Sequence, residues 1–168
     1  MKIFWNYIFF STWKVLTALT RIFIEKPIDY LFSLIPCYRN HKNREEIEKI
    51  NYYIMHGKVV GINIIHAFRV LMLTTFVFLG TLAFYFLYFF NFDFKDDVVF
   101  YSSAFFVAIL SYFMNEYLMS WSKSGYIEYF EVFEKKRNKL KESCVFLFFH
   151  LGTLAFAILS VYFTIFYE

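Results

Sequence analysis

The third of three long apolar stretches in this chain contains one histidine, His150, and no Lys, Arg, Asp or Glu. An ionisable group is costly to bury in a membrane, so it is by default a candidate for a proton or ion path. An imidazole can also change its charge near neutral pH and so act as a gate. The alternative is a neutral histidine, hydrogen-bonded to a Ser, Thr or Tyr hydroxyl on a neighbouring helix. The sequence leaves both interpretations open.

A second intramembrane charge is Glu116, which lies beside Asn115 near the end of the second apolar stretch. It could pair with Arg69 or His66 at the start of the first stretch, which the topology described below places at the same depth. Such a pair would hold two helices together, whereas a carboxylate in a conducting path is the alternative. We favour the pairing of helices.

Two further patterns could bind ions. Cys37 and His41 have a ligand-like spacing, but structural zinc needs four ligands and no second Cys or His pair accompanies them. An acidic connection could form a ring at a pore mouth in a ring-shaped oligomer, although such a loop is more often simply solvated. Its residues are Asp93, Asp96 and Asp97. We therefore expect no metal and no other cofactor.

A basic cluster lies directly before the third apolar stretch. Anionic lipid headgroups attract such clusters by about 1 kcal/mol per basic residue. We predict that this cluster contacts lipid headgroups. Binding of RNA or protein is the alternative for the cluster, although we do not expect nucleic acid as a partner of the chain. The cluster consists of Lys135, Lys136, Arg137, Lys139 and Lys141.

The elements that must position these residues are the apolar stretches themselves, at residues 70–91, 98–121 and 143–167. About 20 apolar residues in a helix cross the roughly 30 Å of bilayer hydrocarbon. The chain is also 60% apolar, far above a soluble domain. These features predict an all-α integral membrane protein with three transmembrane helices. Its membrane domain covers residues 66–168 and includes a cytoplasmic helix at 126–142, which we expect to continue unbroken into the last span.

The topology follows from the basic residues. All of the 17 Lys and Arg except Lys95 fall on one side of this arrangement. Basic segments stay in the cytoplasm. We therefore expect a cytoplasmic N-terminus, an external acidic connection and an external C-terminus.

Residues 1–26 resemble a fourth span, but Lys14 and Arg21 lie in its middle. A charged residue at the centre of a span costs about 2.5–3.5 kcal/mol on insertion scales. We favour an interfacial amphipathic helix over a tilted span with a snorkelling lysine. Its expected polar face holds Ser11, Lys14, Ala18, Arg21 and Glu25, and its apolar face Trp5, Ile8, Phe9, Leu16, Leu19 and Phe23. Residues 27–65 are expected to form a small cytoplasmic helical segment.

Small residues mark candidate helix-packing positions. The sequence Leu-Gly-Thr-Leu-Ala-Phe occurs at residues 79–84 and again at 151–156. In membranes, small side chains let helix backbones approach closely. We predict packing at Gly80, Ala83, Gly152 and Ala155, with Ala104 and Ala108 at matching spacing in the second stretch.

Catalytic motifs are missing from the sequence. It has no phosphate-binding G-x-x-x-x-G-K-S/T, no zinc-protease H-E-x-x-H and no nucleophile elbow G-x-S-x-G. We therefore do not expect an enzyme.

Two segments carry a resemblance to known proteins: Met1-Lys-Ile-Phe-Trp-Asn-Tyr-Ile-Phe-Phe10, and Tyr126-Ile-Glu-Tyr-Phe-Glu-Val-Phe-Glu-Lys-Lys136 before a Phe-rich span. Together they resemble small inner-membrane proteins of Bacteroidetes-type bacteria. Membrane accessory proteins of phage-defence loci, including those beside type VI-B CRISPR effectors, are similar in size and character. The resemblance implies a bacterial inner membrane. The R-x4–6-H motif of some such proteins does not occur here.

We expect an oligomeric membrane protein that forms a pore or perturbs the membrane potential, as an effector or accessory protein in a stress or antiviral response. Its expected partners are membrane lipids, further copies of itself, and unlike membrane or effector subunits. The alternative is a non-catalytic structural subunit of a larger membrane complex, for example an AT-rich organellar respiratory assembly. A proton-coupled carrier that uses His150 and Glu116 is a third, weaker class.

Overall fold

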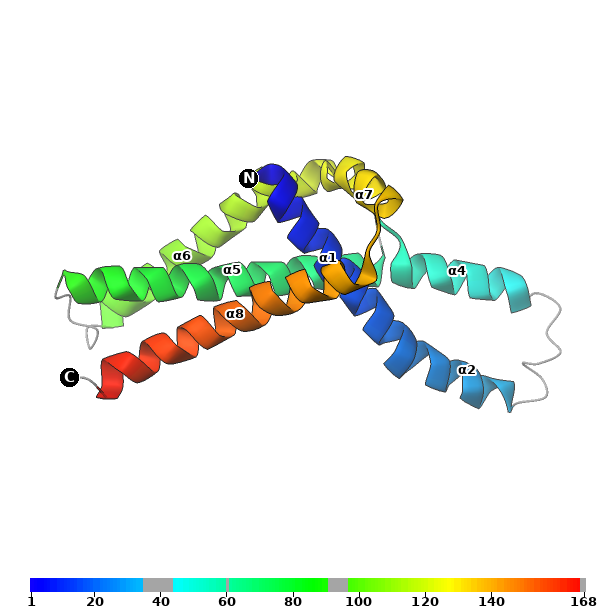
Figure 1. The fold of residues 1–168 in the computed structure, drawn as a ribbon, viewed down its shortest axis with the longest axis horizontal. Coiled ribbons are helices and arrows are strands. Elements are labelled where there is room, and N and C mark those ends of the chain that lie inside the picture. The colour runs from blue at the N-terminus through cyan, green and yellow to red at the C-terminus, as the bar shows by residue number, and fades with distance from the viewer. Residues whose placement is uncertain (35–43, 60, 91–96, 167–168) are drawn as a thin grey trace.

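The computed structural model describes residues 1–34, 44–59, 61–90 and 97–166, and these residues form helices joined by short connections (Figure 1). The prediction of an all-α protein is confirmed for this part of the chain. The helices are α1 (Lys2–Thr20), the π-helical turn η1 (Arg21–Glu25), α2 (Lys26–Ser33), α4 (Arg44–His56), α5 (Ile62–Phe89), α6 (Asp97–Met119), the 3₁₀ turn η2 (Trp121–Lys123), α7 (Tyr126–Lys135) and α8 (Lys139–Phe166).

Four segments are long and apolar enough to cross a membrane: Lys2–Leu31, Ile62–Phe89, Asp97–Met119 and Lys139–Thr164. The last three correspond to the predicted spans. The first meets the same criteria of length and composition, although the sequence favours an interfacial position for it. The count of three spans therefore stays a prediction.

The N-terminal helix continues through Pro27 because the turn before it is wider than an α-helix. A proline ring clashes with the carbonyl four residues earlier and has no N–H to donate. In η1 the Lys26 N–H donates to Arg21 O, five residues back, which is the π-helical pattern. The wider turn lets α1, η1 and α2 form one continuous element, where the sequence suggests a boundary at Pro27.

α1 lies at the centre of the packed core. In the N-terminal segment Lys2–Leu31, 33% of an 18-residue apolar part is buried inside the protein. The corresponding share is 11% in each of the other three apolar segments. It crosses α5 and α8 in their N-terminal halves, with α7 and the end of α6 on the same side (Figure 1). Ile8 and Phe9, expected to face lipid, are fully buried against protein. The predicted apolar face of α1 therefore packs on other helices at these positions.

An aromatic cluster surrounds this crossing. Phe9 contacts the rings of Trp121, Tyr126 and Phe130 at centroid distances of 5.2–5.7 Å. Trp13 stacks on Phe130 with centroids 5.2 Å apart. Aromatic pairs in such geometries add about 0.5–1.5 kcal/mol each beyond their buried area. This cluster joins α1 to α7.

The predicted unbroken helix from residue 126 into the last span is wrong. α7 ends at Lys135, and α8 begins at Lys139. The Asn138 side-chain Oδ1 accepts a hydrogen bond from the Lys141 backbone N–H at 3.1 Å, which is a helix N-cap. An Asn that caps a new helix stabilises the break, because its side chain competes for backbone donors.

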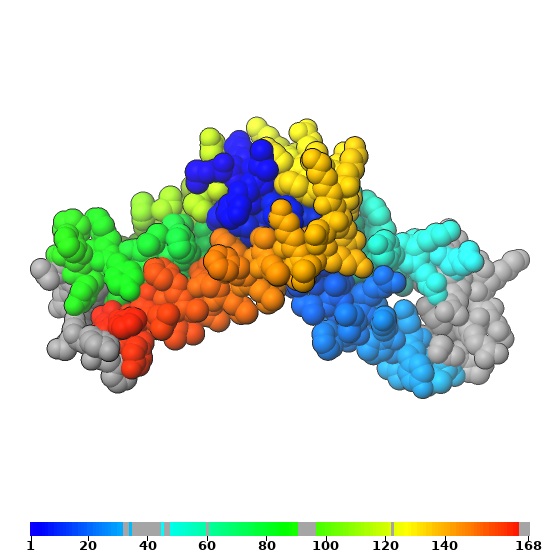
Figure 2. All heavy atoms as spheres, viewed as in Figure 1, coloured from blue at the N-terminus to red at the C-terminus, as the bar shows by residue number. Residues whose placement is uncertain are grey.

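The three predicted spans form an open row. α5 packs against both α6 and α8, but α6 and α8 are not packed against each other in the described residues. At the other end of the molecule, α2 and α4 extend away from the body, and residues of both helices line one pocket (Figure 2). Cys37, His41, Asp93 and Asp96 lie outside the described residues.

Candidate functional site at the crossing of α1 with α5 and α8

His150 joins three helices. Its Nε2 lies 2.8 Å from Thr12 Oγ1 of α1, and its Nδ1 lies 2.6 Å from Thr74 Oγ1 of α5. The ring is part-buried and packs beside Phe146 and Phe149 of its own helix. Both ring nitrogens therefore have a partner on a different helix.

The two threonines give this junction a choice of proton arrangements. Thr12 Oγ1 also lies 2.8 Å from Ile8 O, and Thr74 Oγ1 lies 2.9 Å from Val70 O. Each hydroxyl has one proton and a neutral imidazole has one N–H. With a neutral ring, one threonine must donate to the ring and release its backbone carbonyl. With a protonated ring, both threonines can donate to their carbonyls. The junction can thus hold either form after rotation of one hydroxyl.

A second set of polar contacts ties α1 to α6. Trp5 Nε1 donates to Asn115 Oδ1 at 3.0 Å, and Asn6 Nδ2 donates to Leu118 O at 3.0 Å. Asn6 and Asn115 are fully buried. Ser111 Oγ donates to Met72 O at 3.2 Å and so joins α6 to α5. Such interhelical bonds contribute about 0.6 kcal/mol each in membrane proteins.

An ion cluster joins α1, α7 and the connection before α5. Glu134 accepts hydrogen bonds from Lys14 at 2.7 Å and from Lys58 at 2.5 Å. Burial alone would raise the pKa of Glu134, but the hydrogen bonds and charges of the two lysines outweigh it and hold this pKa below its usual value. Lys14 also lies 4.2 Å from the centroid of the Trp13 ring. Lys14, expected on a headgroup-facing surface, is therefore paired within the protein.

A polar network fastens α4 to the N-terminal helix. Asn63 Nδ2 donates to His56 Nδ1 at 2.9 Å, and Thr20 Oγ1 donates to Asn63 Oδ1 at 3.0 Å. The other ring nitrogen of His56, Nε2, lies 2.5 Å from Glu25 Oε1. The start of α5 is thereby fixed against η1 and α4.

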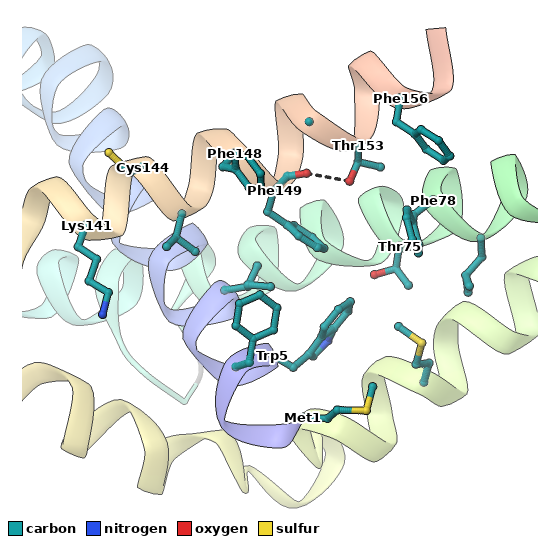
Figure 3. A pocket seen from close by; sticks show the side chains of 16 residues that line it. Met1, Trp5, Thr75, Phe78, Lys141, Cys144, Phe148, Phe149, Thr153 and Phe156 are labelled. Carbon is teal, nitrogen blue, oxygen red and sulfur yellow. Dashed lines mark hydrogen bonds between the residues drawn. The ribbon is translucent and has the colours of Figure 1, made fainter. Parts of the chain in front are cut away.

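An apolar groove of about 910 Å³ runs between α1 and α8, with sides formed by α5 and α6 (Figure 3). Its lining includes Phe4, Trp5 and Phe148, and Lys141 stands at one end. Pockets of about 300–1,000 Å³ are the usual size for small-molecule sites.

The predicted pairing of Glu116 with Arg69 or His66 stays a prediction. Glu116 is partly buried, and Arg69 and His66 are exposed. The neighbouring Asn115 makes a contact between α6 and α1. His150 is the one predicted intramembrane polar residue that the structure places at the crossing of helices.

The basic cluster lies where α7 gives way to α8, and all five of its side chains are exposed. Arg137 Nε lies 3.5 Å from Glu142 Oε2, and Lys141 Nζ lies 5.3 Å from the centroid of the Tyr7 ring. Contact of this cluster with lipid headgroups stays a prediction.

The small residues do not bring backbones together within the chain. A methyl group added to Gly80 or Gly152 would meet no atom within 4 Å. Gly80, Ala83 and Ala104 line a cavity of about 250 Å³ between α5 and α6. Ala108 and Ala155 are exposed.

Thr12, Thr74, Asn6 and Trp5 are the site residues that sequence reasoning did not single out. Their signal was present: Asn6 and Thr12 are uncharged polar residues inside an apolar helix, where an unpaired polar group is costly. Their partners lie more than 60 residues away in the chain, which local periodicity cannot indicate.

No protein-family model, curated protein or solved structure matches this chain. The functional argument therefore depends on the geometry of the chain's own residues.

Proposed function

We propose that this chain acts in a membrane as an oligomer of identical copies, which forms a pore or perturbs the membrane potential. The observation that carries this proposal is the open row of α6, α5 and α8. Although α1 packs against all three of these helices, many apolar side chains of α6 and α8 remain exposed, among them Phe105, Phe106 and Phe163. Further copies can cover these side chains and close the arrangement by symmetry.

The open glycines support the same proposal. Gly80 and Gly152 have free space where a side chain would stand. Close helix approach at small residues is a main source of association between membrane helices. Gly80 lines the cavity between α5 and α6, and Gly152 lines the groove between α1 and α8, so a neighbouring copy would use this space by inserting a side chain into these openings.

A polar side chain on the outer face of α6 also supports the proposal of self-association. Tyr112 is 47% exposed, and its hydroxyl makes no hydrogen bond to the described residues. An unpaired hydroxyl in hydrocarbon is costly. A neighbouring copy that covers α6 would give Tyr112 a partner.

The experiment compares wild type with Gly80→Leu in lipid vesicles. Native mass spectrometry measures the number of copies, and release of a trapped ion-sensitive dye measures permeability. We expect a discrete oligomer and dye release for wild type, and a loss of both for Gly80→Leu. Leu82→Ile, a volume-conserving change at an exposed α5 position, is the matched control. A strictly monomeric protein that leaves vesicles sealed would contradict the proposal.

A non-catalytic subunit of a larger membrane complex is the second candidate, favoured by the exposed surface of α4. Tyr52 and Tyr53 are each 63% exposed on this helix, and Ile50 is 53% exposed. An apolar surface on an arm outside the predicted spans is a candidate contact for an unlike subunit. Co-purification of a stoichiometric unlike protein, lost in a Tyr52→Ser/Tyr53→Ser variant, would favour this candidate over the pore.

A further inference from the structure

The groove between α1 and α8 is long and lined almost entirely by apolar side chains. One face of α8 lines it from Lys141 to Phe156, at the three- and four-residue spacing of a helix face. At a rise of 1.5 Å per residue this face is about 22 Å long. Figure 3 shows Lys141 at one end of the groove and Phe156 at the other.

The inside of the groove fits hydrocarbon. Its walls are mainly aromatic and aliphatic side chains, including Phe4 and Ile8 of α1 and Phe78 of α5. A methyl group added at Gly152, in the lining, would meet no atom within 4 Å. The absence of a side chain at this position therefore leaves room for an occupant.

The charge at the end of the groove selects for an anion. Lys141 is exposed there, and no acidic side chain lines the groove among the described residues. Glu142 follows Lys141 in the chain, but it is buried and its Oε2 lies near Arg137 Nε. Lys141 lies over the Tyr7 ring but has no acidic partner among the described residues, so its charge can meet a negatively charged group from the bilayer.

We propose that this groove binds one acyl chain of an anionic phospholipid from the surrounding bilayer, with the lipid phosphate at Lys141. A lipid chain reaches from the headgroup to the bilayer midplane, about 15 Å or half of the hydrocarbon thickness. The groove is longer than this distance, so a chain can lie along α8 with its headgroup at the basic end. The site belongs to a single copy and does not depend on self-association.

Trp5 lines the groove and reports on its occupant. In a protein with Trp13→Phe and Trp121→Phe, Trp5 is the remaining tryptophan. This single-tryptophan protein is reconstituted in vesicles that contain increasing fractions of phosphatidylglycerol or phosphatidylcholine with brominated acyl chains. The bromine atoms quench the fluorescence of the Trp5 indole on contact. We expect about fivefold tighter apparent binding of the anionic lipid, which corresponds to roughly 1 kcal/mol for one basic residue.

Two pairs of variants distinguish the contribution of the lipid headgroup to binding from that of the acyl chain. Lys141→Gln should abolish the preference for the anionic lipid, whereas Lys136→Gln, in the same basic cluster but outside the groove, should retain it. Gly152→Leu should reduce quenching by both lipids because it fills the groove. Gly80→Leu leaves the groove intact and should not change quenching, even where it changes the number of copies.

Equal quenching by both lipids, unchanged in Gly152→Leu, would overturn the proposal and indicate unselective lipid contact. Absent quenching together with disulfide cross-linking of copies through Cys144, which also lines the groove, would assign the groove to a second copy instead. If the single-tryptophan protein does not fold, native mass spectrometry decides with the unmodified protein. Wild type and Lys136→Gln should then retain phosphatidylglycerol from mixed bilayers, and Lys141→Gln should not.

Discussion

Thr12 Oγ1 and His150 Nε2 lie 2.8 Å apart, although 138 residues separate them in the chain. With Thr74 on the other ring nitrogen, this contact joins the N-terminal helix to two predicted spans at one imidazole. The position of α1 is therefore coupled to the hydrogen bonds that His150 makes.

We predict that His150→Leu lowers the free energy of unfolding by about 1 kcal/mol, since two interhelical hydrogen bonds of about 0.6 kcal/mol each are lost. The cost stays small because both threonines retain their backbone acceptors. Reversible unfolding in mixed micelles measures the change. In a double-mutant cycle, Thr12→Val and His150→Leu should couple by about 0.6 kcal/mol.

The control for this cycle is Thr81→Val, because Thr81 donates to Val77 O of its own helix. It should show no coupling to His150→Leu. Equal coupling for both threonines would mean that the measured energy does not come from the contact with His150. Changed dye release from vesicles that contain folded His150→Leu would assign His150 a role in permeation as well.

Glu134→Gln should make stability less dependent on pH. The folded pKa of Glu134 is below its unfolded value, so the folded state binds fewer protons between the two values. The stabilisation is present above the unfolded pKa, about 4.3, and is lost as pH falls through the folded pKa. We expect a loss of about 1 kcal/mol near pH 7, because the site is partly exposed.

Unfolding of the wild type and Glu134→Gln between pH 3 and pH 7 tests this expectation. Glu131→Gln, on an exposed position of the same helix, should keep the wild-type profile within a few tenths of a kcal/mol. If the free energy of unfolding depends on pH in the same way in wild type and Glu134→Gln, the ion cluster of Glu134, Lys14 and Lys58 does not stabilise the fold.

Asn138→Ala should destabilise the start of α8 by about 1 kcal/mol, the usual cost of a lost N-cap. Amide hydrogen exchange at Lys141, whose N–H donates to Asn138 Oδ1, should become faster. Asn138→Asp retains an acceptor and should preserve slow exchange. If Asn138→Ala leaves this exchange unchanged, the break between α7 and α8 has another cause.

Both ends of the N-terminal helix should be accessible from the same side of the membrane. We predict that Lys2→Cys and Lys26→Cys, in a protein without native cysteines, react with an impermeant maleimide from the side that labels Lys136→Cys. The physical reason is that α1 crosses α5 and α8 near one end of the row, where charged Lys14 is paired with Glu134. Val98→Cys should be labelled from the opposite side. Reaction of Lys2→Cys and Lys26→Cys from opposite sides would establish a fourth span.

The apolar helices could be predicted from the sequence because lipid and length impose them locally. A stretch such as Ile62–Phe89 satisfies its backbone hydrogen bonds within itself, so its residues alone specify a helix. The break at Asn138 was also encoded locally, as a capping residue, but the strong helix propensity on both sides obscured it.

His150 could be identified from the sequence, since an ionisable group inside an apolar stretch is rare and costly. Its partners Thr12 and Thr74 could not, because threonine is common in membrane helices and its role depends on which helix faces it. Equal depth in the membrane does not determine which faces of two helices meet.

The sequence by itself thus determined the helices, their apolar character and the presence of a histidine within an apolar helix. Only the tertiary structure decided that α1 is the centre of the core, with Ile8 and Phe9 buried and Lys14 paired with Glu134. The physical reason is that an apolar helix face is satisfied equally by lipid or by protein. Amphipathicity therefore indicates that Ile8 and Phe9 avoid water, and the packing of distant helices decides what covers them.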